Sequence, residues 1–561
     1  MRMKKIILLL LFPFIAFSQQ SKYPQDYFRN PLNIPILLAG NFGECRPNHF
    51  HSGIDIKTLG KENLPVFAAA DGYISRIKMD KGGFGHALYI THPNGFTTLY
   101  AHLNNFMPSV QKYTKKMQYE KESWSVDLSL LPDQFPVKKG QQIAWSGNTG
   151  GSAGPHLHFE IRDTKTEHPL NPMLFGFPIV DTRSPVPTQL SFYDMNQSIY
   201  NQNAQFTSLK KQGNVYTTVK DTVEVNTDRL GIGINVNDFM NGSANTLNFY
   251  TASWYMDNVL QGSILLDDIG YDVTRYLHAY VDYKTRKQKS AWFQLLFQLP
   301  GNFLSHIYPS LNMQKGNLVL NDNAAHRVRV ELKDAAGNQT NISFFVKTGA
   351  TTRGAECTNR FEVNSPNNFE HPNIRFALGD KALYQDVCFE FSSKSDEKNF
   401  SDRYQVHYSY VPVHTYFDLQ IKPNKPVPFN LRDKMVMMYS DGKSEDGRAA
   451  IFENGWYKSS VRNFGNYWLT TDTTAPVITS LQVQNANLAT AKQLRFRVKE
   501  NITSVKNFRA TLNGKWICFE PRGDIFFYNF DEHCPKGKHK LTITVSDENN
   551  NSKTLVFNFT R

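Results

Sequence analysis

The sequence predicts an all-β protein that is divided into several domains. Phe, Tyr and Trp make up 13% of its 561 residues, and aromatic residues favour strands. Short runs of alternating apolar and polar residues recur along the chain, with turns rich in Gly, Asn and Asp between them. A chain of this length exceeds what one hydrophobic core organises, so we expect separate domains in sequence order.

The first residues have the layout of a secretory signal peptide. Arg2, Lys4 and Lys5 precede an almost wholly apolar run, Ile6 to Phe17, which is too short to span a bilayer comfortably. We expect residues 1–18 to be removed on export, and the alternative is an uncleaved N-terminal anchor. No later run of apolar residues reaches the length of a membrane helix, so we expect no integral span in the mature chain.

The net charge of the chain is +12, but Lys and Arg are not concentrated in one long basic run. No nucleic-acid-binding motif stands out, so nucleic acid is not an expected partner. A basic exported protein suits an anionic extracellular polymer, such as cell wall or surface glycan.

The segment 19–183 is expected to form the first domain, because it is dense in Gly and His and alternates short strands with tight turns. The clearest predicted strands are Val66–Ile77, Ala87–His92, Thr97–His102 and His156–Ile161. Residues 106–136 differ in composition and are predicted to be a partly helical surface insertion near the site.

The rest of the chain is predicted to form β-sandwich domains. The segments 327–338 and 540–550 resemble each other, since each is an alternating strand that ends in an Asp-led turn before another strand. This pattern is typical of immunoglobulin-like sandwiches. A linker is predicted at Asp472–Pro476, where a proline opens a new series of strands. The expected sandwich domains are 184–348, 349–471 and 472–561.

Five cysteines are too few for a disulfide scaffold. Two pairs are candidates for bridges, namely Cys518 with Cys534 and Cys357 with Cys388. Cys45 is then left over, and no base is identified beside it that would make it a nucleophile.

Two histidines near residue 157 share one face of a predicted strand. His156 and His158 are two positions apart, so their imidazoles project into the same space, whereas Leu157 and Phe159 point into a core. The Gly-rich approach to this strand lets the backbone turn sharply and leaves room for a substrate.

His51 and Asp55 form a second chemical group, four positions apart. In a straight strand they would lie roughly 13 Å apart, which is too far for one metal ion. Gly53 allows the chain to bend, and the pair then becomes a workable set of ligands. Imidazoles and a carboxylate suit zinc, and three protein ligands leave a fourth position for water.

Together these pieces resemble a known family. His-x-x-x-Asp at 51–55, Tyr-x-His-Leu at 100–103 and His-x-His-Phe-Glu at 156–160 look like the signature of lysostaphin/LytM-type zinc endopeptidases. The intervening segments Pro65–Gly72, Gly82–Gly85 and Val137–Gly150 are also similar to the family, so the resemblance covers about residues 40–177. It implies a LytM-type β-sheet peptidase domain with a duplicated hybrid motif.

The resemblance implies roles for five residues. His51, Asp55 and His158 would bind Zn²⁺. His102 and His156 would be the unligated pair that deprotonates the attacking water and stabilises the oxyanion, with the two tasks not divided between them.

Four further residues with ionisable side chains lie in or near these motifs. Glu160 either orients a ligand from behind or makes a surface salt bridge. His49, His86 and His92 have no place in the motif and are expected to be non-catalytic.

The sequence therefore favours an exported zinc endopeptidase that cuts peptide bonds in peptidoglycan stem peptides or cross-bridges. It would act in the periplasm, on the cell surface or after secretion. One alternative is a wall-binding regulator that activates another peptidoglycan hydrolase. Another is an adhesin-like surface protein whose sandwich region binds glycan or protein. In each case the C-terminal domains are expected to position the first domain or to contact a cell-envelope partner.

Overall fold

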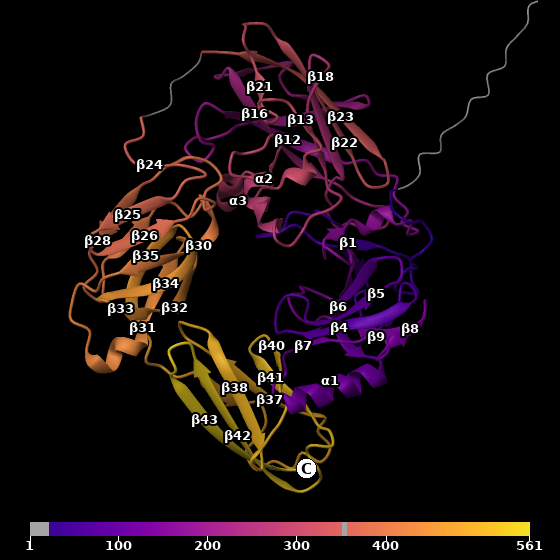
Figure 1. The fold of residues 1–561 in the computed structure, drawn as a ribbon, viewed down its shortest axis with the longest axis vertical. Helices are drawn as coiled ribbons and strands as arrows, with labels where there is room; N and C mark the ends of the chain where they lie inside the picture. The colour runs from indigo at the N-terminus through magenta and orange to yellow at the C-terminus, as the bar shows by residue number, and fades with distance from the viewer. Residues whose placement is uncertain (1–21, 351–355) are drawn as a thin grey trace, which may run out of the picture.

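The structure is a computed structural model that describes residues 22–350 and 356–561. The predicted signal peptide lies outside the described residues. Strands dominate every part of the described chain, which confirms the all-β prediction. Figure 1 shows the domains following one another around a ring, so that the C-terminal domain, in yellow, lies beside the N-terminal domain, in indigo and purple. The terms N-terminal, second, third and C-terminal domain refer to the predicted segments 19–183, 184–348, 349–471 and 472–561.

The N-terminal domain is built on an antiparallel sheet with the strand order β1-β2-β10-β6-β5-β4-β7, and β9 joins β3 to β6. Its elements are β1 (Leu38–Gly40), β2 (Ile54–Lys57), β3 (Pro65–Phe67), β4 (Gly72–Met79), β5 (His86–Thr91), β6 (Phe96–Phe106), α1 (Pro108–Glu120), β7 (Val126–Ser129), β8 (Pro136–Val137), β9 (Gln142–Ser146), β10 (His156–Asp163), β11 (Pro169–Leu170) and the 3-10 helix η1 (Pro172–Leu174). The order places the motif-bearing strands β2, β10 and β6 side by side.

One strand prediction for this domain is wrong. Residues 66–77 form two strands, β3 and β4, which pair with different partners, β9 and β5. The chain leaves the first at Ala68, whose amide donates to the carbonyl of Gln141. Gly72 then begins the second strand where a Cβ atom would lie 2.3 Å from the carbonyl oxygen of Thr91. Close packing of the backbone therefore divides residues 66–77 into two strands. The alternation of apolar and polar residues in the sequence does not reveal this packing.

The predicted insertion contains helix α1 and strand β7. Pro108 begins the helix at a position where a missing N–H is tolerated, and the buried residues Val110, Thr114 and Gln118 recur every four positions along one face. The strand β7 extends the sheet at β4. The partly helical character is confirmed, but the helix lies against the C-terminal domain (Figure 1).

The second domain is a curved set of strands in which β13 connects two halves. Its first residues pair with β12 and its last residues pair with β14. The elements are β12 (Val186–Asp194), β13 (Gln205–Gln212), β14 (Val215–Thr218), β15 (Thr222–Val225), β16 (Arg229–Asn237), β17 (Thr251–Met256), β18 (Val259–Leu265), η2 (Thr274–Tyr276), α2 (Leu277–Tyr280), α3 (Tyr283–Lys289), β19 (Gln294–Leu295), η3 (Ser305–Ile307), β20 (Ser310–Leu311), β21 (Leu318–Val319), β22 (His326–Lys333) and β23 (Gln339–Thr348).

The third domain has two main sheets, ordered β25-β26-β30-β34-β33 and β28-β29-β35-β31-β32. The elements are β24 (Arg360–Phe361), β25 (Asn367–His371), β26 (Ile374–Leu378), β27 (Val387–Cys388), β28 (Phe391–Lys394), β29 (Arg403–Val406), β30 (Pro412–Ile421), η4 (Phe429–Lys434), β31 (Met435–Ser440), β32 (Glu445–Ala449), β33 (Ile451–Glu453), β34 (Trp456–Asn463) and β35 (Gly465–Thr471). Its buried side chains form one continuous core with those of the second domain.

The C-terminal domain is a small two-sheet sandwich with strand orders β36-β37-β41-β40 and β39-β38-β42-β43. The elements are β36 (Val477–Ser480), β37 (Gln493–Lys499), β38 (Val505–Leu512), β39 (Lys515–Trp516), β40 (Glu520–Arg522), β41 (Ile525–Asn529), β42 (Lys538–Asp547) and β43 (Ser552–Thr560). Phe496 from one sheet and Phe557 from the other pack in the same core. The two similar segments found in the sequence are the hairpins β22–β23 and β42–β43.

Of the two candidate disulfides, one forms and the other does not. Cys357 and Cys388 form a disulfide, whereas Cys45, Cys518 and Cys534 are free thiols within the described part of the chain. The candidate Cys518–Cys534 bridge does not form. Cys534 is buried in the core of the C-terminal domain, whereas Cys518 is only partly buried and lies between the core residues Ile517 and Phe519.

The N-terminal and second domains interlock. Phe42 and Phe50 from the N-terminal domain are buried in the core of the second domain. In return, Met240 and Leu247 of the second domain join the core of the N-terminal domain. This exchange of apolar side chains holds the second domain against the strands that carry the motifs. In residues 22–350 and 356–561, no helix is long and apolar enough to cross a membrane.

The C-terminal domain contacts the N-terminal domain through α1. Lys115 Nζ lies 2.6 Å from Asp531 Oδ2, and the ring of Tyr119 stacks on His533 with centroids 3.6 Å apart. Glu122, just after the helix, pairs with Arg509 at 2.5 Å. The ring in Figure 1 is therefore closed by side-chain contacts.

Candidate active site

Three neighbouring strands bring the predicted site residues together. In the pairing of β10 with β2, His158 lies opposite Asp55 and His156 lies opposite Lys57. In the pairing of β10 with β6, His158 also lies opposite Ala101, which places His102 next to the same point of the sheet. The register therefore gathers residues that are up to 107 positions apart in the chain.

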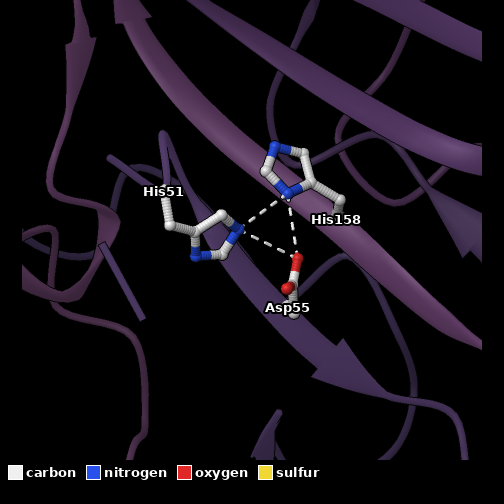
Figure 2. A group of neighbouring side chains, drawn as sticks. All are labelled: His51, Asp55 and His158. Atoms are coloured by element: carbon white, nitrogen blue, oxygen red, sulfur yellow. Dashed lines mark hydrogen bonds and ion pairs between the residues drawn. The ribbon is translucent and has the colours of Figure 1, made fainter. Parts of the chain in front are cut away.

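His51, Asp55 and His158 converge on one point (Figure 2). His51 Nε2 lies 3.1 Å from Asp55 Oδ1 and 3.0 Å from His158 Nδ1, and the last pair, His158 Nδ1 and Asp55 Oδ1, is 2.9 Å apart. Tetrahedral zinc with ligands at about 2.0–2.1 Å would separate them by roughly 3.3 Å. The three ligand atoms fit such an ion with a small outward movement.

The orientation of His51 depends on a hydrogen bond to Asn41 and on the bend of the chain at Gly53. Its Nδ1 donates to the carbonyl oxygen of Asn41 at 2.7 Å, because a carbonyl can only accept. This leaves Nε2 as the free acceptor that faces Asp55 and His158. The chain bends at Gly53, as predicted, and a Cβ atom there would lie 2.3 Å from the carbonyl oxygen of Phe159. Only glycine allows β10 to approach this closely.

Glu160 lies behind the ligand His158. Its side chain is fully buried, and Oε1 lies 2.8 Å from His158 Nε2, while Oε2 accepts from Arg162 Nε at 2.7 Å. The ion pair of Glu160 lies in the interior and not on the surface, so its position fits the orientation of His158. Holding Nε2 as a donor leaves Nδ1 to face the metal position.

A tyrosine from the second domain completes this network. The hydroxyl of Tyr271 lies 2.7 Å from Glu160 Oε1 and 3.0 Å from Ser52 Oγ, and it accepts from Arg162 Nη2 at 2.9 Å. The sequence motifs revealed neither Tyr271 nor Arg162. The sequence did contain a signal for Arg162, which follows Glu160 by two positions on a buried strand. A buried arginine needs a carboxylate partner on the same face.

Electrostatics in the site favour binding a cation. Burial alone would lower the pKa of His158, but hydrogen bonds with Asp55 and Glu160 outweigh it and raise the pKa to about 9. Burial lowers the pKa of His51 to about 4. In the metal-free protein, a proton on His158 Nδ1 thus lies between Asp55 and the neutral His51. A metal ion would take the place of this proton.

His102 and His156 form the second half of the site, with ring centroids 4.7 Å apart. His102 Nδ1 donates to the carbonyl of Thr149 and His156 Nδ1 donates to that of Gly154, each across 2.8 Å. In its neutral form, each ring then keeps Nε2 as a proton acceptor. Burial, followed by the charges of His158 and His156, lowers the pKa of His102 to about 3.

The backbone at His102 is strained. Its φ is 58°, a left-handed conformation that is uncommon for a residue with a side chain. The conformation is held because the His102 amide donates to the carbonyl of Phe84 at 2.9 Å while the ring is fixed by Thr149. Strain of this kind is concentrated at functional sites.

The two halves open into a cleft of about 620 Å³. Asp55, His102 and His156 line it, together with the Gly151–Pro155 loop and Arg46. Arg46 Nη2 donates to Asp55 Oδ2 at 2.6 Å, so Oδ1 is the oxygen left for a metal. Arg46 is a further site residue that the motifs did not indicate.

The three remaining histidines lie elsewhere. His49 is exposed and contacts Asn48. His92 is buried between the carbonyl of Asp71 and the hydroxyl of Thr98. His86 is buried and faces Glu520 of the C-terminal domain, with Nε2 and Oε1 3.7 Å apart. None of the three lines the described cleft.

Comparison with known proteins agrees with this geometry. Residues 49–119 and 127–172 match the sequence profile of peptidase family M23, and residues 358–472 match that of the Zu5-like domain. The first of these matches contains all five residues of the two site halves. The N-terminal domain is a peptidase family M23 domain. The M23 domain thus carries the predicted family resemblance, and the Zu5-like match falls on the third domain.

Two similar proteins each match about a quarter of this chain. The DD-carboxypeptidase/endopeptidase Mpg of Neisseria meningitidis is 37% identical over 128 residues, which are 23% of this chain and 23% of that protein. The murein hydrolase activator NlpD of Salmonella typhimurium is 29% identical over 147 residues, 26% of this chain and 31% of that protein. The chain thus spans about a quarter to a third of the length of these relatives.

Among solved structures, the catalytic domain of the M23 protein EnpA from Enterococcus faecalis is similar to this chain at 22% identity. The match covers 26% of this chain and 95% of that one, with a TM-score of 0.19.

Proposed function

We propose that this protein is an exported zinc-dependent endopeptidase that hydrolyses peptide bonds in peptidoglycan stem peptides or cross-bridges. The observation that carries the proposal is the convergence of His51 Nε2, Asp55 Oδ1 and His158 Nδ1 beside the imidazoles of His102 and His156. A purely structural metal site would be closed by a fourth protein ligand. Here the metal position borders a cleft instead.

Zinc bound by His51, Asp55 and His158 would supply Lewis acidity and make water nucleophilic near neutral pH. The protein's own residues handle the protons. Nε2 of His102 or His156 can accept a proton from the attacking water, and the resulting imidazolium can donate to the oxyanion or to the leaving amine. Their Nδ1 hydrogen bonds to backbone carbonyls keep both rings aimed into the cleft.

Peptidoglycan is the proposed substrate because the match is to an M23 domain and a matched relative bears the name DD-carboxypeptidase/endopeptidase. An extended stem peptide or cross-bridge could enter the cleft past the Gly151–Pro155 loop, where glycine leaves space for a backbone. A polymer of this kind lies outside the cytoplasm, so the proposal includes export to the periplasm, the cell surface or the medium. The C-terminal domains would then hold the M23 domain near a cell-envelope partner.

The proposal is tested by digesting purified peptidoglycan with the full mature chain and analysing the products by mass spectrometry. New free amino termini should appear, and they should vanish with a chelator and in His51→Ala. His49→Ala is the matched control, because His49 is an exposed neighbour outside the cleft and its loss should leave the rate unchanged.

The second candidate function is that of a wall-binding regulator of another hydrolase. It is favoured by the similarity to the murein hydrolase activator NlpD. The complete set of His51, Asp55, His158, His102 and His156 argues for the enzyme instead. A protein that binds zinc but leaves several wall types uncut, while stimulating a separate amidase, would replace the first proposal with the second.

A further inference from the structure

A second carboxylate cluster lies away from the active site, at the connection between the M23 domain and the second domain. One oxygen from each of Asp181, Asp238 and Asp334 lies within 4.8 Å of the others. Asp181 belongs to the connecting segment, Asp238 directly follows β16, and Asp334 directly follows β22. Asp238 and Asp334 are each only 2% exposed, so these carboxyl groups meet in the protein interior.

The cluster has hydrogen-bond donors, but none of its carboxylates forms an ion pair with a cationic side chain in the described residues. Asp334 accepts from the backbone and side-chain nitrogens of Asn338, and Asp181 accepts from the amide of Arg183. The guanidinium of Arg183 itself lies over the ring of Phe239, 4.8 Å from its centroid. Buried carboxylates are normally paired with a cation or bound to a metal.

One oxygen of the cluster is left without any partner. Asp238 Oδ1 is inaccessible to solvent and receives no hydrogen bond from the described residues. A buried carboxylate oxygen that receives no hydrogen bond, in a residue whose carboxyl lies close to two others, suits a hard cation.

We propose that Asp181, Asp238 and Asp334 bind a calcium ion that fixes the connection between the M23 domain and the second domain. Oxygen-only ligands from flexible segments suit calcium, whereas zinc prefers nitrogen and sulfur, and magnesium demands a tighter octahedral site. Bound at this position, the ion joins the connecting segment to two separate places in the second domain. It would therefore hold Tyr271, and with it the network behind His158, against the M23 domain.

The same arrangement recurs where the C-terminal domain begins. Asp472, Glu500 and Asp547 also have oxygens within 4.8 Å of one another. Asp-Thr-x-x-Pro-Val occurs at both 181–186 and 472–477, and the other two acids again follow a strand and begin a hairpin turn. Because the same motif and the same arrangement of carboxylates occur at the start of both domains, the clusters are a repeated structural feature and not a coincidence.

The hydrogen bonds around the two clusters also correspond. The side-chain nitrogen of Asn338 donates to Asp334 at 2.7 Å and to the carbonyl of Asp181 at 3.2 Å. Likewise, the side-chain nitrogen of Asn551 donates to Asp547 at 2.7 Å and to the carbonyl of Asp472 at 2.9 Å. In both places an asparagine ties the linker aspartate to the turn aspartate.

The test is calcium titration of the full zinc-loaded chain by calorimetry, in buffer freed of calcium by a resin. We expect binding with a dissociation constant on the order of 10⁻³ M or tighter, as in extracellular modules. Asp238→Asn keeps the shape of the side chain and should weaken this binding at least tenfold. Asp221→Asn, which changes an exposed carboxylate of the same domain, should bind as the parent chain does.

Thermal unfolding separates lost binding from lost folding. Calcium should raise the Tm of the parent chain, since it binds the folded state, and should raise that of Asp238→Asn by less, because that variant loses one of the sites. Without calcium, Asp238→Asn should melt no lower than the parent, because it carries less repulsion among the buried carboxylates. Asp181→Asn, in the half-buried linker, should lose calcium binding in the same way.

Two results would overturn the proposal. One is a parent chain that neither binds calcium at millimolar concentration nor gains Tm from it. The other is an Asp238→Asn or Asp181→Asn variant that binds the same number of ions as the parent with the same affinity, which would place any bound calcium elsewhere, such as at Asp472. Because peptidase activity is not the readout, the result is independent of the proposed function.

Discussion

The hydroxyl of Tyr271 lies 2.7 Å from Oε1 of Glu160, the carboxylate that holds the metal-facing His158. Tyr271 belongs to the second domain and lies outside the M23 match. The second domain therefore contributes directly to the network behind the metal position, and the interlocked cores keep it there. This relationship suggests that the isolated M23 segment would lack part of its support.

Tyr271→Phe should weaken zinc binding, because it removes a hydroxyl donor to Glu160 and leaves the ring in place. Loss of such a supporting hydrogen bond typically costs about 10–100-fold in metal affinity or activity. Competition with a chromogenic chelator measures the zinc affinity, and release of amino termini from peptidoglycan measures the rate. Tyr255→Phe, elsewhere in the second domain, is the control. Unchanged zinc affinity in Tyr271→Phe would show that the hydroxyl has no positioning role.

Glu160→Gln should destabilise the fold strongly, because it leaves Arg162 buried without its charge partner. Breaking a buried ion pair from one side typically costs about 3–5 kcal/mol. Urea unfolding measures the loss. Glu167→Gln is the matched control, since Glu167 also faces Arg162, at 3.8 Å, but is 69% exposed. An exposed pair should contribute no more than about 1 kcal/mol. Equal effects of the two changes would contradict the buried network.

His102→Ala and His156→Ala should retain bound zinc and lose activity, whereas His51→Ala should lose both. General acid–base groups contribute roughly 10²–10⁴-fold to rates. Zinc content by atomic absorption, measured beside the rate on peptidoglycan, distinguishes the two classes. A His102→Ala or His156→Ala variant that failed to hold zinc would instead place that residue among the ligands.

Opening the ring is a test of the contact between α1 and the C-terminal domain. Lys115→Ala combined with Tyr119→Ala removes the ion pair with Asp531 and the stacking on His533. The radius of gyration from small-angle X-ray scattering should then increase. Lys116→Ala, on the same helix, changes a side chain that is 70% exposed and pairs with Glu120, so it should leave the radius unchanged. A double variant with the parent's radius would show that these contacts do not close the ring.

Local pattern in the sequence, read together with the family resemblance, predicted three side chains that the structure brings together. A separation of two positions places His156 and His158 on one face of any strand, and Gly53 allows the bend that brings His51 back to Asp55. The strands and turns follow from the same alternation, which is why the all-β class and the two similar hairpins were predictable. Their physical basis lies within a few residues of chain.

Tertiary structure alone decided what surrounds these ligands. Tyr271 reaches Glu160 across 111 positions, and Lys115 meets Glu532 across 417, so no local pattern could connect them. The sequence also left the cysteine pairing open, because whether Cys518 and Cys534 meet depends on how the domain packs. The sequence by itself determined which side chains can bind the metal. The packing of domains determined which side chains hold them in place, because contacts between distant segments arise only when their cores form.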